Sequence, residues 1–191
     1  MDKLQELKKH LKRGQVYRRA DMSKWSASVD RHLSALVQDG TLQKLSQGLY
    51  HYPEQTAFGQ APPEDHVMVR RFLKDDRFLL TSFNAYNALG VGTTQLYNQK
   101  TVYNHKRHGE FILGGKAFSF RVKPHFPLRA TPEFLLVDLV NNLELLAEDP
   151  LEVLEKVKKK AAAMDGGKLR RSLREYGNAR AKKLLEPLTT V

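Results

Sequence analysis

The sequence predicts an α+β protein, and three patterns along its 191 residues support that fold class. Two stretches near the start repeat apolar residues at helical spacing, and a pair of strand-like runs joined by a glycine-containing turn follows them. The middle of the chain holds short runs with strand patterning. The C-terminal part returns to helical patterning and is rich in lysine and arginine. We therefore expect an N-terminal winged helix-turn-helix, a mixed α/β domain with a small antiparallel sheet, and a basic helical C-terminal tail.

The N-terminal module is predicted to begin with a helix over Lys3–Lys12. Leu4, Leu7 and Leu11 recur at helical spacing and would form one buried stripe, while the lysines lie off that stripe. Gly14 follows, and glycine is a common left-handed residue just past a helix end. The helix should therefore stop before this glycine.

A short strand and two helices are expected next. Val16-Tyr17 has strand character, and Arg19–Met22 suits the short middle helix of such a module. The second full helix is predicted over Ser26–Gln38, which has one apolar face. Ser26 is the expected N-cap, since its hydroxyl can accept a hydrogen bond from a first-turn amide. Asp30 would complement the helix dipole.

A β-hairpin, or wing, is predicted to close the module over Thr41–Tyr52. Strand-like runs at Thr41–Leu45 and Leu49–Tyr52 flank Ser46-Gln47-Gly48, and glycine supplies the positive φ that tight hairpins often need. This order of helices and hairpin predicts a winged helix-turn-helix over residues 1–53.

This module is predicted to bind duplex DNA, with helix Ser26–Gln38 in the major groove and the hairpin near the backbone. Arg31 can bond a guanine edge through two hydrogen bonds, and residues near the hairpin tip can contact phosphate. The alternative is a winged helix that only docks another protein. The predicted DNA-binding residues are Lys24, Ser26, Ser28, Arg31, Lys44 and Gln47.

The composition favours a polyanion as partner. A formal net charge of +11 draws a protein to nucleic acid, although many basic proteins bind nothing specific. The chain has no cysteine, which excludes a disulfide framework, a zinc ribbon and a thiol nucleophile. No apolar run is long enough to cross a membrane, and the N-terminus lacks the apolar core of a signal peptide. We therefore expect a cytoplasmic protein with no membrane partner.

The rest of the chain is predicted to comprise a linker over residues 54–63 and a second domain over residues 64–191, because proline and glycine mark the linker. Gly114-Gly115 should form a hairpin turn, and the alternating pattern of the strand after it predicts an antiparallel sheet. The expected helices are His66–Lys74 and Asn84–Leu89, and the expected strands are Phe78–Leu80, Thr101–Tyr103, Glu110–Leu113 and Ala117–Val122.

A cationic loop, Asn104–His108, lies between two of these strands and contains Lys106 and Arg107. It is either a polyanion-binding loop or an ordinary solvated hairpin loop. His105 and His108 have a spacing compatible with metal binding. No cysteine or acidic ligand pattern accompanies them, so no metal site is predicted.

A core helix is predicted to start at Thr131-Pro132-Glu133, which combines an N-cap, a first-position proline and a first-turn acid. Apolar residues occupy most sides of Phe134–Leu146, so this helix should lie at the centre of the second domain. Asp138 within it is either a catalytic carboxylate or a structural one paired with a nearby arginine. One carboxylate alone does not make an acid–base pair, which favours the structural interpretation.

The C-terminal tail combines helical patterning with an excess of positive charge. A helix is expected over Pro150–Ala163, and two shorter helices should follow Gly166-Gly167. Leucines on these helices need burial, so the basic residues should form a folded face rather than a merely solvated run. Together with the cationic loop, this face is a candidate polyanion or partner surface, with residues Lys106, Arg107, Lys168, Arg170, Arg171, Arg174, Arg180, Lys182 and Lys183.

Several segments together resemble the AbiEi-type antitoxins of type IV, or abortive-infection, toxin–antitoxin systems. In the N-terminal module the similar segments are Tyr17–Asp21, Ser28–Leu33, Leu36–Leu42 and Gly48–Pro53. Further along the chain they are Ser82–Gly90, Thr93–Leu96 and Glu133–Leu139, so that the resemblance extends over about two-thirds of the chain.

The resemblance implies a protein that binds inverted repeats in its own promoter through the winged helix and represses transcription. It also implies an antitoxin that counteracts a nucleotidyltransferase toxin, generally without a stable complex. Such a protein needs no catalytic residue, metal or cofactor, and it would act as a monomer or as a pair formed on DNA. Two alternatives remain: a winged-helix adaptor that binds protein, and a metal-dependent nucleic-acid-processing enzyme that uses Asp138, Glu133, His105 and His108.

Overall fold

The computed structural model describes residues 3–189 as an α+β protein that divides into two compact units. Unit 1 contains the chain up to Asp76 together with Glu110–Ala117, and unit 2 contains Arg77–Gly109 together with the chain from Phe118 onward. Unit 1 therefore extends beyond the boundary predicted at residue 53 and takes in a second, distant segment of the chain.

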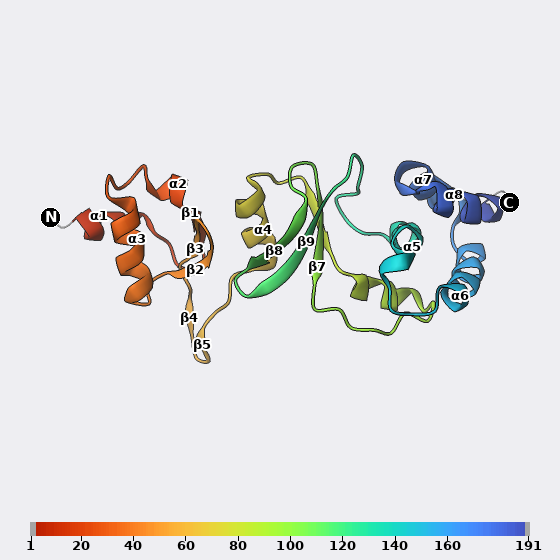
Figure 1. Ribbon diagram of the computed structural model, residues 1–191, viewed down its shortest axis with the longest axis horizontal. Coiled ribbons are helices and arrows are strands. Elements are labelled where there is room, and N and C mark those ends of the chain that lie inside the picture. The colour runs from red at the N-terminus through yellow and green to blue at the C-terminus, as the bar shows by residue number, and fades with distance from the viewer. Residues whose placement is uncertain (1–2, 190–191) are drawn as a thin grey trace. The chain divides into compact units, whose positions relative to one another are not determined.

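Unit 1 begins with a three-stranded antiparallel sheet and three helices, in the order helix, strand, helix, helix, strand, strand (Figure 1). The sheet has the strand order β1-β3-β2, so the first strand pairs with the last. Leucines from α1, α3 and the segment before β2 are buried in one cluster with the β1 residue Tyr17. The elements are α1 (Lys3–His10), β1 (Val16–Arg18), α2 (Arg19–Met22), α3 (Val29–Gln38), β2 (Gln43–Ser46) and β3 (Leu49–His51).

The start of α3 differs from the sequence prediction. The helix begins at Val29 and its N-cap position is Ser28, whose side chain makes no capping hydrogen bond. Ser26, the expected cap, is buried, and its Oγ lies 2.8 Å from Nδ1 of His32. Ser26 Oγ also accepts a hydrogen bond from the backbone amide of Ser28. The turn before α3 therefore directs this hydroxyl into the interior, where it satisfies a buried histidine.

The segment predicted as a linker contains a small hairpin, β4 (Gln55–Thr56) and β5 (Gly59–Gln60). Helix α4 (Asp65–Leu73) follows, and it is tied to the returning segment of unit 1. Lys116 Nζ lies 2.7 Å from the Asp65 carboxylate, and the rings of Phe72 and Phe111 meet edge to face at 5.0 Å.

The main sheet has the strand order β6-β7-β9-β8, with β6 (Phe78–Thr81), β7 (Lys100–Asn104), β8 (Gly109–Leu113) and β9 (Lys116–Val122). Strands β6 and β7 are antiparallel, as expected, but β7 and β9 run parallel, so this sheet is mixed. Strand β9 lies between β7 and β8, and the loop after β7 is therefore not a hairpin loop. The predicted Gly114-Gly115 turn does join β8 to its neighbour β9. The alternation along β9 carried no information about the strand on its other side, which is β7.

Helix α5 (Pro132–Asn141) lies at the centre of the helical part of unit 2, as predicted (Figure 1). It begins where the sequence indicated, with Thr131 Oγ1 accepting a hydrogen bond from the Phe134 amide and Pro132 in its first turn. Apolar residues of the surrounding helices pack on it. Those elements are η1 (Phe83–Leu89), η2 (Leu143–Leu145), α6 (Pro150–Ala162), α7 (Gly166–Tyr176), α8 (Ala179–Leu185) and η3 (Glu186–Thr189).

Side-chain caps fix the C-terminal helices at the expected positions. Asp149 accepts hydrogen bonds from the amides at the start of α6, Asp165 caps α7, and Asn178 caps α8. The joint near Gly177 is confirmed as a helix boundary, whereas Gly166-Gly167, expected to precede the next helix, form the first two residues of α7. Among residues 3–189, no helix has the length and apolar character needed to cross a membrane.

Candidate nucleic-acid interface

Helices α2 and α3 are joined by a two-point ion pair at the surface of unit 1. Arg19, at the start of α2, donates from Nε and Nη2 to the two carboxylate oxygens of Asp30, both at 2.6 Å. The backbone amide of Arg19 also donates to the carbonyl of Gly48 in the β2–β3 turn, at 2.9 Å. Arg19 thus connects the two helices and the hairpin turn through hydrogen bonds.

The pair changes the electrostatics of α3. Its hydrogen bond to Arg19 lowers the pKa of the Asp30 carboxyl, and the same bond raises the pKa of the Arg19 guanidinium. Asp30 therefore stays ionised, and Arg19 balances its negative charge. The exposed face of α3 is left with Arg31 as its one lysine or arginine.

Helix α3 presents a clear division between a buried and an exposed side. Val29, His32, Leu33 and Leu36 are buried, and they pack this helix onto the core of unit 1. The exposed side carries small and polar residues beside Arg31, namely Ser28, Ser34 and Gln38. Such a face can approach another surface closely and offers hydrogen-bond donors and acceptors to it.

Five of the six predicted DNA-binding residues are exposed, and one is not. Lys24 lies just before α3, Lys44 is on β2, and Gln47 lies in the β2–β3 turn; Ser28 and Arg31 complete the exposed set. Ser26 is a correction, because it is 8% exposed and bonded to His32. A hydroxyl in that position cannot reach a ligand without breaking the turn that starts α3.

Arg19 and Ser34 also lie at this surface, although the sequence pattern did not single them out. Ser34 lies on the same exposed face as Arg31 and was recoverable from helical spacing alone. Arg19 and Asp30 are eleven residues apart in different helices, and no local spacing rule connects them.

A buried asparagine shapes the cationic loop of unit 2. Asn104 is 1% exposed. Its Oδ1 accepts hydrogen bonds from the amides of Lys106 and Arg107 at 2.8 and 2.7 Å, and its Nδ2 donates to the Arg107 carbonyl at 2.9 Å. These bonds hold the loop in a tight turn with the side chains of Lys106 and Arg107 exposed. The backbone of this loop after β7 is thus held in one conformation by the Asn104 side chain.

The predicted basic surface of the C-terminal helices is exposed except at one position, since Lys182 is half-buried. Arg170 donates to the carbonyl of Thr189, and Arg180 is paired with Glu144, so these two arginines hold parts of the fold together. The other exposed members are Lys168, Arg171, Arg174 and Lys183. A cavity of about 220 Å³ on α7 is lined by Gly167, Arg170, Arg171 and Arg174.

Asp138 is a buried structural residue of unit 2. It is 2% exposed and accepts hydrogen bonds from the hydroxyls of Tyr86 and Tyr103, at 2.6 and 2.8 Å. Asn142 donates to both tyrosine oxygens, and Arg121 donates to Asn142 Oδ1 at 2.9 Å. The arginine expected beside Asp138, Arg121, therefore bonds to Asn142 and not to the carboxylate itself.

Burial in this network raises the pKa of Asp138 and also raises the pKa values of both tyrosines. Asp138 is thus buried and bonded within the fold, which agrees with the structural interpretation of this carboxylate. Within residues 3–189, no three histidines or acids come together in a way that could hold a metal ion.

Comparison with known proteins gives a fold relationship. No protein-family model matches the chain, and no curated protein matches it. Among solved structures, the crystal structure of the RV2827C protein from Mycobacterium tuberculosis matches with a TM-score of 0.59 and 15% sequence identity. The match covers 97% of this chain and 74% of that one. The chain therefore shares its fold with the RV2827C protein over nearly its whole length.

Proposed function

We propose that this protein is a winged helix-turn-helix DNA-binding protein that represses transcription from its own promoter. The observation that carries the proposal is the Arg19–Asp30 pair, which joins α2 to α3 beside an exposed α3 face and a β2–β3 hairpin. In helix-turn-helix proteins the second helix of such a pair enters the major groove while the first crosses the backbone.

The exposed residues suit these roles. Arg31 lies in the first turn of α3, where a side chain can reach a base edge and make two hydrogen bonds to guanine. Ser28 at the N-cap position is small enough for the helix to approach the groove. Lys44 and Gln47, on the hairpin, would contact phosphate and fix the register. Asp30 does not oppose this approach, because Arg19 balances its charge.

We further propose that the protein is the antitoxin of a type IV toxin–antitoxin system and counteracts a nucleotidyltransferase toxin. The support is the resemblance of seven segments to AbiEi-type antitoxins, which includes the β1–α2 and α3 regions just described. A protein with this role needs no catalysis. Two copies would meet on inverted repeats in the promoter, either as monomers or as a pair formed on the DNA.

DNA binding is tested with a labelled duplex from upstream of the protein's own gene, titrated at low salt. Arg31→Ala should weaken binding about 5- to 150-fold, which corresponds to about 1–3 kcal/mol for a lost bidentate base contact. Lys159→Ala removes another exposed positive charge, on α6, and serves as the control, with affinity expected within twofold. Equal losses in the two variants would contradict the assignment of α3.

The antitoxin role is tested separately in cells. A nucleotidyltransferase encoded next to this gene should arrest growth when expressed alone, and co-expression of this protein should restore it. The Arg31→Ala variant should lose repression while still restoring growth, since the resemblance to AbiEi-type antitoxins places toxin counteraction in the C-terminal domain and not in the winged helix. Failure of the wild-type protein to restore growth would contradict the antitoxin proposal and leave the DNA-binding proposal intact.

A further inference from the structure

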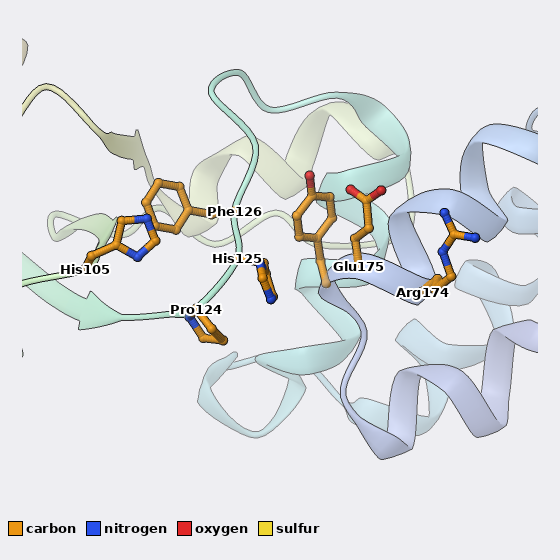
Figure 2. A pocket seen from close by; sticks show the side chains of 7 residues that line it. His105, Pro124, His125, Phe126, Arg174 and Glu175 are labelled. Atoms are coloured by element: carbon orange, nitrogen blue, oxygen red, sulfur yellow. The ribbon is translucent and has the colours of Figure 1, made fainter.

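Unit 2 contains a cavity of about 490 Å³ that the proposed function does not use. Figure 2 shows its lining side chains, with a histidine and a phenylalanine ring together at one end and an arginine at the other. The volume lies within the range of small-molecule sites, which is roughly 300–1,000 Å³. The side chains that matter here are His105, His125, Phe126, Arg174, Glu175 and Tyr176.

One end of the cavity is a platform of stacked rings. The centroids of His105 and Phe126 are 4.6 Å apart, and their planes differ by 30°. Phe126 is half-buried and packs against the cluster of Leu79, Tyr103 and Phe134, so it supports the more exposed imidazole. The Asn104 turn holds His105 at this position. A flat aromatic ligand could stack on such a platform without rearranging it.

The opposite wall is also fixed. The ring of Tyr176 meets that of Phe134 edge to face at 5.3 Å, and the Tyr176 carbonyl accepts a hydrogen bond from Asn141 Nδ2 at 2.8 Å. His125 also lines the cavity, and in the view of Figure 2 it is drawn between His105 and Glu175. The cavity therefore has aromatic side chains from two segments that are held by packing, with a second imidazole in its lining.

Positive charge flanks the cavity on both sides. Lys106 and Arg107 follow His105 in the same turn, and Arg174 lines the cavity itself. Arg171 lies one turn back along α7, in the smaller cavity that Arg174 also lines. Glu175 is the one acid among the lining residues. The surroundings thus favour an anionic ligand that extends out of the cavity and along α7.

We propose that this cavity binds one nucleotide of a single-stranded nucleic acid. The base stacks on the His105–Phe126 platform, Arg174 pairs with a phosphate, and the backbone continues past Arg171. Sites for single strands combine a cationic groove with aromatic platforms in this way. A duplex does not fit, because its stacked bases cannot enter a cavity the size of one nucleotide. The proposal concerns unit 2 alone and is independent of DNA binding by α3.

The test uses the full-length protein in an Arg31→Ala, Lys44→Ala background, which removes the proposed duplex contacts. Fluorescence anisotropy is measured with labelled ten-nucleotide uridine RNA and thymidine DNA, and with a duplex of the same length. The background protein should bind at least one single strand more tightly than the duplex. Tighter binding of the uridine strand would assign RNA, and tighter binding of the thymidine strand would assign DNA.

Two further substitutions locate the site. His105→Ala should weaken single-strand binding about tenfold through lost stacking. Arg174→Ala should weaken it and reduce its salt dependence by about one released counterion. Lys159→Ala is the control for loss of positive charge and should change affinity by less than twofold. The proposal is overturned if neither strand binds at low salt, if the duplex binds equally well, or if all three variants behave alike.

Discussion

Helices α3 and α5 are both ten residues long, yet they differ in how much of their surface they leave to solvent. Helix α3 buries one side and exposes Arg31, Ser34 and Gln38 on the other. Helix α5 buries six of its residues, including the charged residue Asp138. The comparison teaches that the role of a polar residue on a helix depends on the side chains around it. Arg31 is exposed and can reach a ligand, whereas Asp138 is buried and bonded to other residues of unit 2.

The largest effect is expected from Asp138→Ala. The substitution leaves the Tyr86 and Tyr103 hydroxyls as buried donors without their acceptor, and it should lower the free energy of unfolding by about 3 kcal/mol. Urea denaturation followed by circular dichroism measures this loss. Glu133→Ala, at a half-exposed position on the same helix, is the control and should cost less than about 0.5 kcal/mol. If both substitutions lowered the free energy of unfolding equally, the hydrogen bonds of buried Asp138 would not be what stabilises α5.

Asp138 also predicts a pH dependence of stability. Burial raises the pKa of this carboxyl in the folded state above its ordinary value of 3.8. The folded protein therefore retains a proton that the unfolded chain releases between these two pKa values, so stability falls as pH rises through that window. The free energy of unfolding of wild type minus that of Asp138→Asn should decline there, by at most about 1.4 kcal/mol per pH unit.

The Asn variant is the appropriate reference because other groups act in the opposite direction. The pKa values of Asp30 and Glu148 are lowered in the folded protein, so their contributions are lost as pH falls. Those contributions cancel in the difference between wild type and variant. A difference that stays flat, or rises with pH, would contradict the buried carboxyl as its source.

Much of the contrast between α3 and α5 could be predicted from the sequence. The apolar spacing of α3 and the Thr131-Pro132 start of α5 were both local patterns, and both helices formed, although α3 starts three residues later than predicted and α5 ends at Asn141 rather than Leu146. Exposure of Arg31 also followed from helical periodicity, and that of Lys44 from its place near the hairpin tip. Such features depend on residues a few positions apart, so a single sequence is enough to predict them.

The features that were missed all join distant residues. The Arg19–Asp30 pair, the parallel pairing of β7 with β9, and the return of Glu110–Ala117 to unit 1 depend on topology. The burial of Ser26 depends on His32, which had no visible role in the sequence pattern. The cavity of unit 2 likewise gathers residues from three separate segments.

A smaller effect separates two neighbouring serines at the start of α3. Ser26→Ala removes a buried hydrogen bond to His32 and should lower the free energy of unfolding by about 1 kcal/mol. Ser28→Ala, at an exposed N-cap without a side-chain bond, should cost less than about 0.5 kcal/mol. Thermal or urea unfolding distinguishes the two. A larger loss of stability for Ser28→Ala than for Ser26→Ala would contradict the buried hydrogen bond between Ser26 and His32.

The smallest expected effect is that of Lys44→Ala on the β2–β3 hairpin. Loss of one phosphate contact should weaken DNA binding about equally for all sequences and reduce the slope of log affinity against log salt by about one. Titrations of specific and scrambled duplexes at several salt concentrations measure this slope. An unchanged slope would show that the hairpin does not touch the backbone.

Amide hydrogen exchange with and without the promoter duplex tests the contrast between α3 and α5 most directly. The proposed function predicts that DNA slows exchange in α3 and in the β2–β3 turn, while the amides of α5 exchange at the same rate in both samples. Protection confined to unit 2, with α3 unaffected at saturating DNA, would contradict it.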